Sequence, residues 1–131
     1  MFSYLIRKFK KEEGQAVVEL ALTLPILIMI LCAIVDFGWI FNNQIMIDNC
    51  SREGARYAIV HSTETIASIK GYTRSVAPAY LTDVLTINVI YDSGNVTVDV
   101  NGGVDVLTPL AGVFTQGQTL DLSSSCTMKV E

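Results

Sequence analysis

The sequence predicts an α+β fold with a long N-terminal helix that is first transmembrane and then amphipathic, a short second helix, and a small antiparallel sheet of about three strands. Three observations lead to this prediction. An uncharged apolar run extends from Leu20 to Val35, helical spacing of apolar residues continues to His61, and a strict alternation begins at Ile87. With 131 residues, 50% hydrophobic and 17% charged, the chain is long enough for one small domain.

The first element is a membrane-spanning helix over residues 15–41. Within Ala16–Phe41 only Glu19 and Asp36 carry a formal charge. A helix of about 20 apolar residues crosses a hydrocarbon core of about 30 Å. An acid at the edge of such a segment marks function or assembly, because lipid accepts an unpaired carboxylate only at a cost.

The charges on either side of this helix predict its orientation. Four bases precede it, namely Arg7, Lys8, Lys10 and Lys11, whereas acids come first after it. The positive-inside rule therefore predicts a single-pass protein of the cell membrane, with a cytoplasmic N-terminus and an extracytoplasmic domain over residues 42–131.

A cleaved secretory signal is the main alternative for the apolar run, since it also combines bases with an apolar stretch. The run is long for such a signal, and the residues after it, from Asp36 to Phe41, lack a pair of small residues for cleavage. A lipoprotein signal around Cys32 is disfavoured because bulky residues precede that cysteine.

The first helix is expected to continue beyond the membrane as one rod of about 70 Å, ending near His61. Pro25 removes one backbone hydrogen bond and should kink or loosen it. After Phe41 the apolar positions recur at steps of three and four. They are Ile45, Ile47, Cys50, Gly54, Tyr57, Ala58 and His61.

The remaining elements are short. A second helix is expected from Thr65 to Val76, ended by Pro78. Apolar and polar residues alternate over Ile87–Tyr91 and over Val96–Val100, with turn residues between the two segments, which predicts a hairpin that ends at residues 101–103. The same alternation predicts a third strand over Leu120–Val130. The loop between the last two strands offers four apolar residues, Leu107, Leu110, Val113 and Phe114, to pack back on the domain. Three strands need a cover, which the amphipathic half of the long helix supplies.

Three blocks of the sequence now carry a family resemblance. Residues 13–25 (EGQAVVELALTLP), 34–38 (IVDFG) and 51–58 (SREGARYA) resemble, in order and spacing, the TadE-like pseudopilins of the Tad (Flp-type) branch of type IV pili. The resemblance is strong over residues 13–60 and weaker beyond. It implies a pilin-like fold.

The resemblance also implies proteolytic processing. In type IV pilin-like proteins a prepilin peptidase cuts after a Gly, and a Glu stands fifth in the mature chain. Gly14, Gln15 and Glu19 match these positions, so residues 1–14 would be a cytoplasmic prepilin leader. Gln15 departs from the Phe or Met usual in major pilins, which puts methylation of the new N-terminus in doubt.

Glu19 has a physical reason to need this cut. The freed α-amino group of Gln15, in this subunit or a neighbouring one, would supply a cation, since such groups titrate near pH 8. The resemblance implies that this pairing sets the axial register during assembly. The alternative is a carboxylate that merely reaches the headgroup level.

Two further pairs of residues are candidates for structure or assembly. Cys50 and Cys126 both lie on apolar faces of the predicted interface, where a disulfide would contribute about 3 to 5 kcal/mol; two buried free thiols are the alternative. Arg52 and Arg56 share one helix face. They are candidate subunit contacts, as is Asp36, which could pair with Arg52 of another subunit; a solvated face with local ion pairs is the alternative.

No catalytic, metal or cofactor site is expected. His61 has no cluster of metal ligands around it, and no Ser or Cys has a recognisable general base. The formal net charge of −4 argues against nucleic-acid binding.

The sequence therefore predicts a non-enzymatic minor pseudopilin, whose partners are prepilin peptidase, other pilins or pseudopilins, the Tad-type assembly or secretion machinery, and membrane lipid. The alternative is an uncleaved single-pass membrane protein with an adhesion or binding module. A small extracytoplasmic enzyme is the least favoured interpretation.

Overall fold

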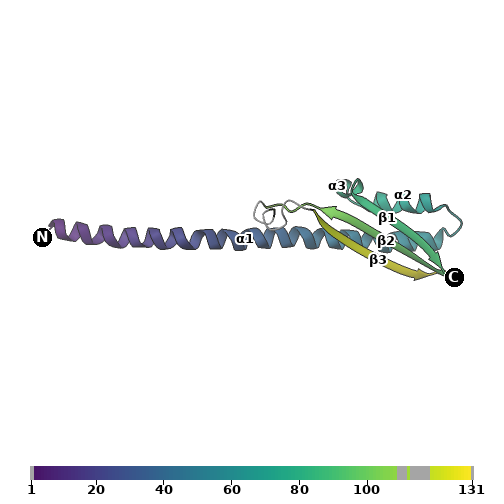
Figure 1. The fold of residues 1–131 in the computed structure, drawn as a ribbon, viewed down its shortest axis with the longest axis horizontal. Coiled ribbons are helices and arrows are strands. Elements are labelled where there is room, and N and C mark those ends of the chain that lie inside the picture. The colour runs from purple at the N-terminus through teal and green to yellow at the C-terminus, as the bar shows by residue number, and fades with distance from the viewer. Residues whose placement is uncertain (1, 109–111, 113–118, 131) are drawn as a thin grey trace.

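A computed structural model describes residues 2–108, 112 and 119–130, with side chains from Gly14 onward. One long helix forms a stem, and a three-stranded sheet with two further helices is folded onto its C-terminal part (Figure 1). The predicted α+β class is confirmed.

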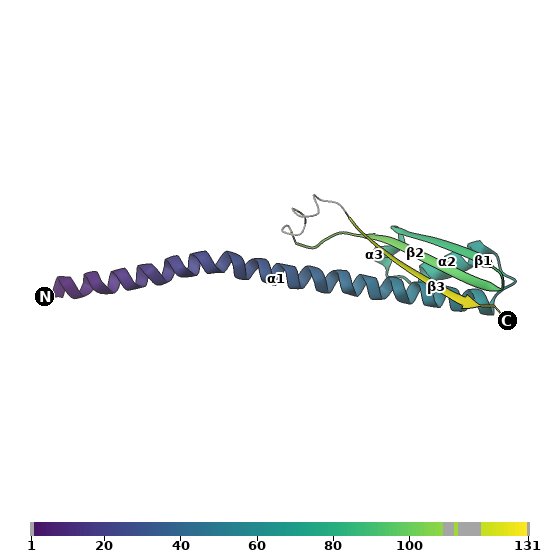
Figure 2. The same ribbon diagram turned by 60° about the horizontal axis from the view of Figure 1, so that its bottom comes forward.

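The stem helix α1 runs over Phe2–Val60 without interruption. It therefore begins before Ala16, where the sequence first indicated a helix, and ends one residue before His61. Pro25 lies inside it, and Figure 2 shows a gentle bend in α1 but no break. The proline expected to kink or loosen the helix therefore leaves α1 continuous.

Two helices follow the stem. Helix α2 covers Ile66–Val76, and the Thr65 side chain caps it by accepting a hydrogen bond from Ser68 N at 3.3 Å. The short helix α3, Ala79–Thr82, follows Pro78 and was not anticipated from the sequence.

The sheet has the order β1-β2-β3, with both pairs antiparallel. Strand β1 is Leu85–Asp92, β2 is Asn95–Val104 and β3 is Leu120–Lys129. The β1–β2 hairpin closes through Ser93 (φ 49°) and Gly94 (φ 81°), the pair of positive φ angles that a tight two-residue turn requires. Strand β2 continues through Gly102 and Gly103, where the sequence predicted its end.

The core lies between the sheet and the helices. α1 packs on β2 and β3, and α2 packs on α1 and β1. The largest fully buried apolar side chains are Ile47, Ile69, Val96, Val98 and Val100. The predicted cover of the sheet by the long helix is confirmed.

The burial pattern of α1 differs in detail from the predicted apolar stripe. Ile45 is exposed, whereas the polar residues Asn43 and Ser51 are buried. Asn43 Nδ2 donates to Trp39 O at 2.8 Å, and Ser51 Oγ donates to Asp48 O at 2.9 Å. These bonds to the preceding turn let short polar side chains occupy the face against the sheet.

The β2–β3 loop is described only in part. Leu107, expected to pack back on the domain, is instead 56% exposed. The other apolar residues of this loop that were expected to pack, Leu110, Val113 and Phe114, lie outside the described residues.

Candidate functional site

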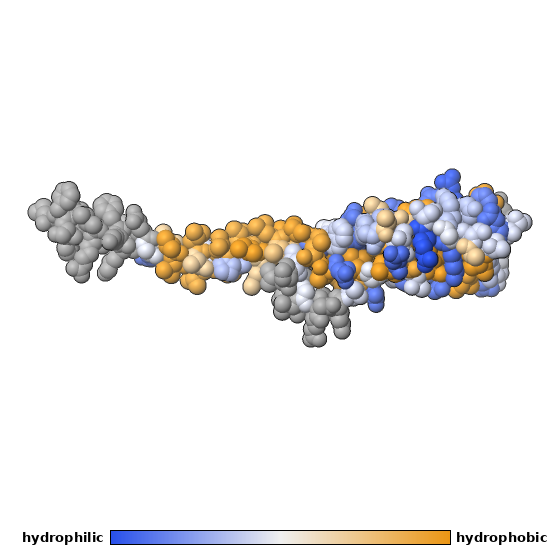
Figure 3. All heavy atoms as spheres, turned by 90° about the horizontal axis from the view of Figure 1, so that it is seen from above, coloured by the Kyte–Doolittle hydropathy of each residue, from blue (hydrophilic) through white to orange (hydrophobic). Residues whose placement is uncertain are grey.

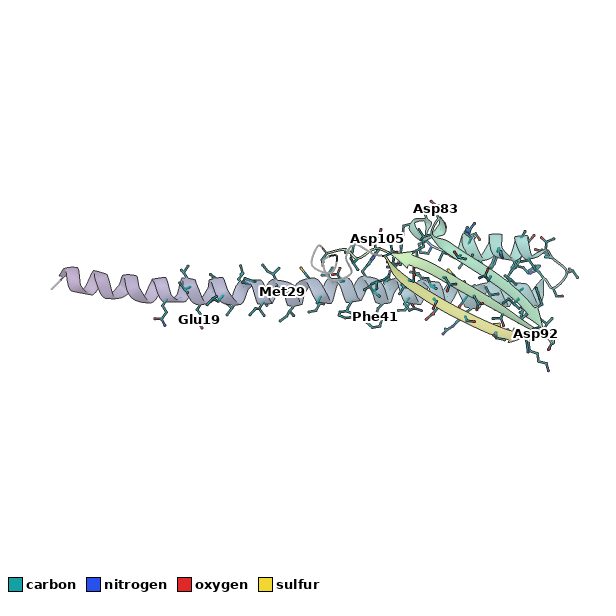
Figure 4. The ribbon with its side chains drawn as sticks, viewed as in Figure 1. Glu19, Met29, Phe41, Asp83, Asp92 and Asp105 are labelled. Carbon is teal, nitrogen blue, oxygen red and sulfur yellow. The ribbon has the colours of Figure 1, made fainter. Side chains whose placement is uncertain are left out.

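The predicted processing residues lie on the part of α1 that no other element covers. Gly14, Gln15 and Glu19 are all exposed. A Cβ built on Gly14 would meet nothing within 4 Å. In Figure 4 the Glu19 side chain projects from the bare helix, far from the sheet.

The Glu19 carboxylate is without a hydrogen bond or ion pair to any described residue. The only bond at this residue involves its backbone, because Thr23 Oγ1 donates to Glu19 O at 3.1 Å. Gln15 and Glu19 are four residues apart and share a helix face. The site therefore presents an unpaired carboxylate one turn from the predicted new N-terminus.

The segment after Glu19 is long and apolar enough to cross a membrane. α1 contains one such candidate span, and none of its most apolar window is buried within the protein. Apolar atoms cover the stem in Figure 3, in contrast to the mixed surface of the domain.

Asp36 lies where the stem meets the domain. Its side chain is only 5% exposed, and its Oδ1 accepts from Leu107 N at 3.2 Å and from Thr108 N at 2.9 Å. Thr108 Oγ1 donates to Oδ2 of the same carboxylate. Asp36 thus holds the beginning of the β2–β3 loop within its own chain. The expected pairing of Asp36 with Arg52 of another subunit stays a prediction, and it would have to add to these contacts.

Arg52 and Arg56 are both exposed on α1, on the side away from the sheet. Neither forms an ion pair within the described part of the chain, so the local pairs that the alternative interpretation required are not present there. At Gly54, α1 comes close to both α2 and the sheet. A Cβ on Gly54 would collide with Thr73 Oγ1 and lie 3.2 Å from Val98 Cγ1.

Cys32, Cys50 and Cys126 are free cysteines in the structure, so Cys50 and Cys126 are not bonded. Cys50 is buried in the core and Cys126 packs against it, as expected for the free-thiol alternative. Burial raises the pKa of the Cys50 thiol.

The spacing of the contacts explains why these two thiols are separate. Cys126 pairs with Val98, which faces Gly54 on α1. Gly54 is one helical turn, about 6 Å, beyond Cys50. A disulfide needs two Cβ atoms within about 3.5 to 4.5 Å of each other, which this offset opposes.

Comparison with protein families gives a match for most of the stem helix after Gly14. The family model described as TadE-like protein matches residues 14–56. This segment is TadE-like. No curated protein and no solved structure matches the chain.

The TadE-like segment begins at Gly14 and ends at Arg56, so it covers all but the last four residues of the candidate span Gly14–Val60. The resemblance stated from the sequence is confirmed there. The match places the candidate membrane-spanning helix within a TadE-like segment. The sheet lies beyond the matched residues.

Sequence reasoning missed the partners that fix the loop to this TadE-like helix. Trp39 Nε1 donates to Asp105 O at 3.1 Å, next to the Asp36 contacts, and the Trp39 ring stacks on Tyr80 with centroids 5.6 Å apart. The available signal was Asp36 itself, since an acid that ends an apolar run needs donors. Nothing in the sequence indicated that backbone amides 71 and 72 residues away would supply them.

Proposed function

We propose that this chain is a non-enzymatic minor pseudopilin that a prepilin peptidase cuts between Gly14 and Gln15, and that then acts in assembly or function of a Tad-type pilus or a related secretion apparatus. One observation carries the proposal. The TadE-like match begins at Gly14, and the fifth residue after it is an unpaired carboxylate on an uncovered, apolar helix.

The cut changes the electrostatics of the helix end. It removes four bases and two acids, and the formal net charge goes from −4 to −6. It also creates an α-ammonium group at Gln15, the nearest cation that Glu19 can reach. A carboxylate at the hydrocarbon edge is costly without such a partner, so pairing with a neighbouring subunit's N-terminus would favour one axial position of the helices.

The helix around Gly14 bears on how the cut occurs. The bond between Gly14 and Gln15 lies inside α1, so its peptide groups take part in helical hydrogen bonding and the helix must open locally before cleavage. Glycine weakens a helix by about 1 kcal/mol relative to alanine, which makes this opening easier. The leader bases favour a cytoplasmic position for the cut.

The outward side of α1 supplies a surface for neighbouring subunits. Phe37, Phe41, Ile45, Arg52 and Arg56, which we call the outer stripe, are all exposed on the side away from the sheet. The apolar surface of the stem thus continues beyond the membrane and ends in two bases without partners in the described chain. We assign the outer stripe to packing against the acidic domains and helices of other pilin-like subunits.

The proposal is tested by co-expressing the full chain with prepilin peptidase and following its length and its recovery with the assembled apparatus. Gly14→Ala should abolish cleavage. Gly38→Ala is the matched control, since it also lies in α1 and its added Cβ meets nothing within 4 Å. Glu19→Gln should still be cut but should lose at least 10-fold in assembly, whereas Glu53→Gln on the same helix should assemble normally.

Two outcomes would contradict the proposal. If Gly14→Ala were processed like the wild type, Gly14 would not define the cut. If the wild-type chain stayed intact in the presence of the peptidase, the alternative of an uncleaved single-pass protein with a binding module would replace it.

A further inference from the structure

The end of the domain nearest the stem presents apolar side chains that are exposed in the described part of the chain. Tyr80, Val84 and Leu107, which we call the basal patch, are exposed on α3, after α3 and at the start of the β2–β3 loop. We propose that the basal patch rests in the outer lipid surface, so that the exported domain lies on the membrane. This inference depends on membrane insertion of α1, but not on cleavage or on a pilus.

The level at which α1 leaves the membrane follows from its length. With Glu19 at the inner edge of the hydrocarbon, about 20 residues at about 1.5 Å each place the outer edge near Gly38. Contacts between the described part of the domain and α1 lie at this level, because Asp36 binds the amides of Leu107 and Thr108, and Trp39 binds Asp105 O.

These contacts hold the basal patch close to the membrane surface. The Trp39 ring connects the two parts of the patch, since it stacks on Tyr80 while its Nε1 donates to the carbonyl two residues before Leu107. Trp and Tyr are enriched at membrane–water interfaces, where their rings enter the apolar region and their polar atoms stay hydrated. The patch is thus continuous with the membrane-spanning surface of the stem.

Asp36 fits this level for an electrostatic reason. A carboxylate at the edge of the hydrocarbon is expensive unless donors satisfy it. Here two backbone amides and one hydroxyl surround it, and the loop that supplies them is held at the same depth. The acid and the start of the loop therefore stabilise each other at the interface.

The charge near the basal patch indicates the kind of lipid. Figure 4 places Asp83 and Asp105 at this end of the domain, and Asp92 at the far end. Arg74, the described base closest to α3, directs its guanidinium to Leu85 O at 3.0 Å. Acids beside the patch disfavour anionic headgroups, so the partner is a zwitterionic surface.

The depth of the patch can be measured in the full chain reconstituted in phosphatidylcholine vesicles. A nitroxide is attached to Leu107→Cys or, as a matched control, to Ile90→Cys on β1, in a background with the native cysteines replaced by alanine. The two positions are 56% and 53% exposed within the protein, so the two labels begin from similar accessibility. Accessibility is read with oxygen, which enters lipid, and with a nickel chelate, which stays in water.

We expect the label at residue 107 to show at least a 3-fold higher oxygen-to-nickel accessibility ratio than the label at residue 90. Equal, water-like ratios in chains that float with the vesicles would overturn the inference while leaving membrane insertion intact. A label at residue 107 shielded from both reagents would indicate a protein partner and overturn it as well. A signal that requires anionic lipid would contradict burial in a zwitterionic surface.

A second variant tests the role of Asp36. Asp36→Asn weakens the contacts to Leu107 and Thr108 and should lower the ratio at residue 107 at least 2-fold, with no change at residue 90. Asp48→Asn is the control, since Asp48 Oδ1 accepts only from Gln44 Nε2 on the same helix. An unchanged ratio in Asp36→Asn, with circular dichroism showing a folded chain, would reject Asp36 as the group that holds the loop.

Discussion

Gly54 shows how a single residue sets the distance from α1 to both α2 and the sheet. Its added Cβ would meet both Thr73 and Val98, and Thr73 is itself fixed by a hydrogen bond from its Oγ1 to Ile69 O at 2.8 Å. Overpacking of this kind costs about 1 to 3 kcal/mol, whereas the helical gain from Gly to Ala is about 1 kcal/mol. The collision with Thr73 puts the cost in the upper part of this range, about 2 to 3 kcal/mol, so we expect Gly54→Ala to lower the free energy of unfolding by about 1 to 2 kcal/mol.

Gly71→Ala is the matched control, because Gly71 also lies inside a helix but a Cβ there meets nothing within 4 Å. This variant should raise the free energy of unfolding by up to about 1 kcal/mol. Both values come from chemical denaturation of the full chain in detergent, followed by circular dichroism. A neutral or stabilising Gly54→Ala would show that the helix and sheet have room to separate.

Asn43 and Asp36 show where residue-level reasoning from the sequence reached its limit. Asn43 is polar and does not belong to the predicted apolar stripe, yet it is fully buried, and its Oδ1 has no hydrogen-bond partner among the described residues. Whether Asn43 is buried depends on the side of α1 on which the sheet packs, and the helical spacing of apolar residues does not define that side to within one residue. Asp36 was predicted as a subunit contact, whereas the donors found for it come from a distant loop of its own chain.

At the scale of elements, the β1–β2 hairpin is the part that the sequence predicted best. Alternating valines and isoleucines defined the strands, and Asp92–Asn95 supplied turn chemistry. The strand end was misplaced because Gly102 and Gly103 were taken as a terminator. Gly102 instead allows a close approach, since a Cβ there would lie 2.9 Å from Leu85 Cδ2.

The hairpin turn gives a prediction that depends on backbone conformation alone. Gly94 has φ 81° and open space around an added Cβ, so Gly94→Ala changes only the cost of a left-handed residue. We expect a loss of about 1 to 2 kcal/mol in the free energy of unfolding. Ser93→Asn, at φ 49°, should be neutral or stabilising, because asparagine tolerates this region better than serine. A Gly94→Ala variant as stable as the wild type would contradict the two-residue turn.

The helices illustrate which element boundaries a sequence can define. α2 agrees with the prediction within one residue, because Thr65 and Pro78 mark its ends. α3 was missed because four residues are too few to show a helical period. α1 extends back to Phe2, where the basic residues before the apolar run gave no period to read.

At the scale of the whole molecule, the structure is that of a stem and a folded domain that share one helix. The apolar composition of the segment predicted the candidate span. The structure agrees, because none of the most apolar window of this helix is buried within the protein. The way the domain meets the stem was not predictable, because it depends on contacts of Asp36 and Trp39 with residues that follow β2. If the basal patch rests in the lipid surface, as we propose, those contacts hold the domain against the membrane.

The proposal that the functional chain begins at Gln15 and not at Met1 concerns the whole molecule. The most direct measurement is the intact mass of the full chain after exposure to prepilin peptidase in membranes, with Gly14→Ala treated in parallel. We predict that the wild type loses the mass of residues 1–14 and Gly14→Ala loses nothing. A wild-type chain that keeps its full mass, or one cut at another bond, would contradict the claim.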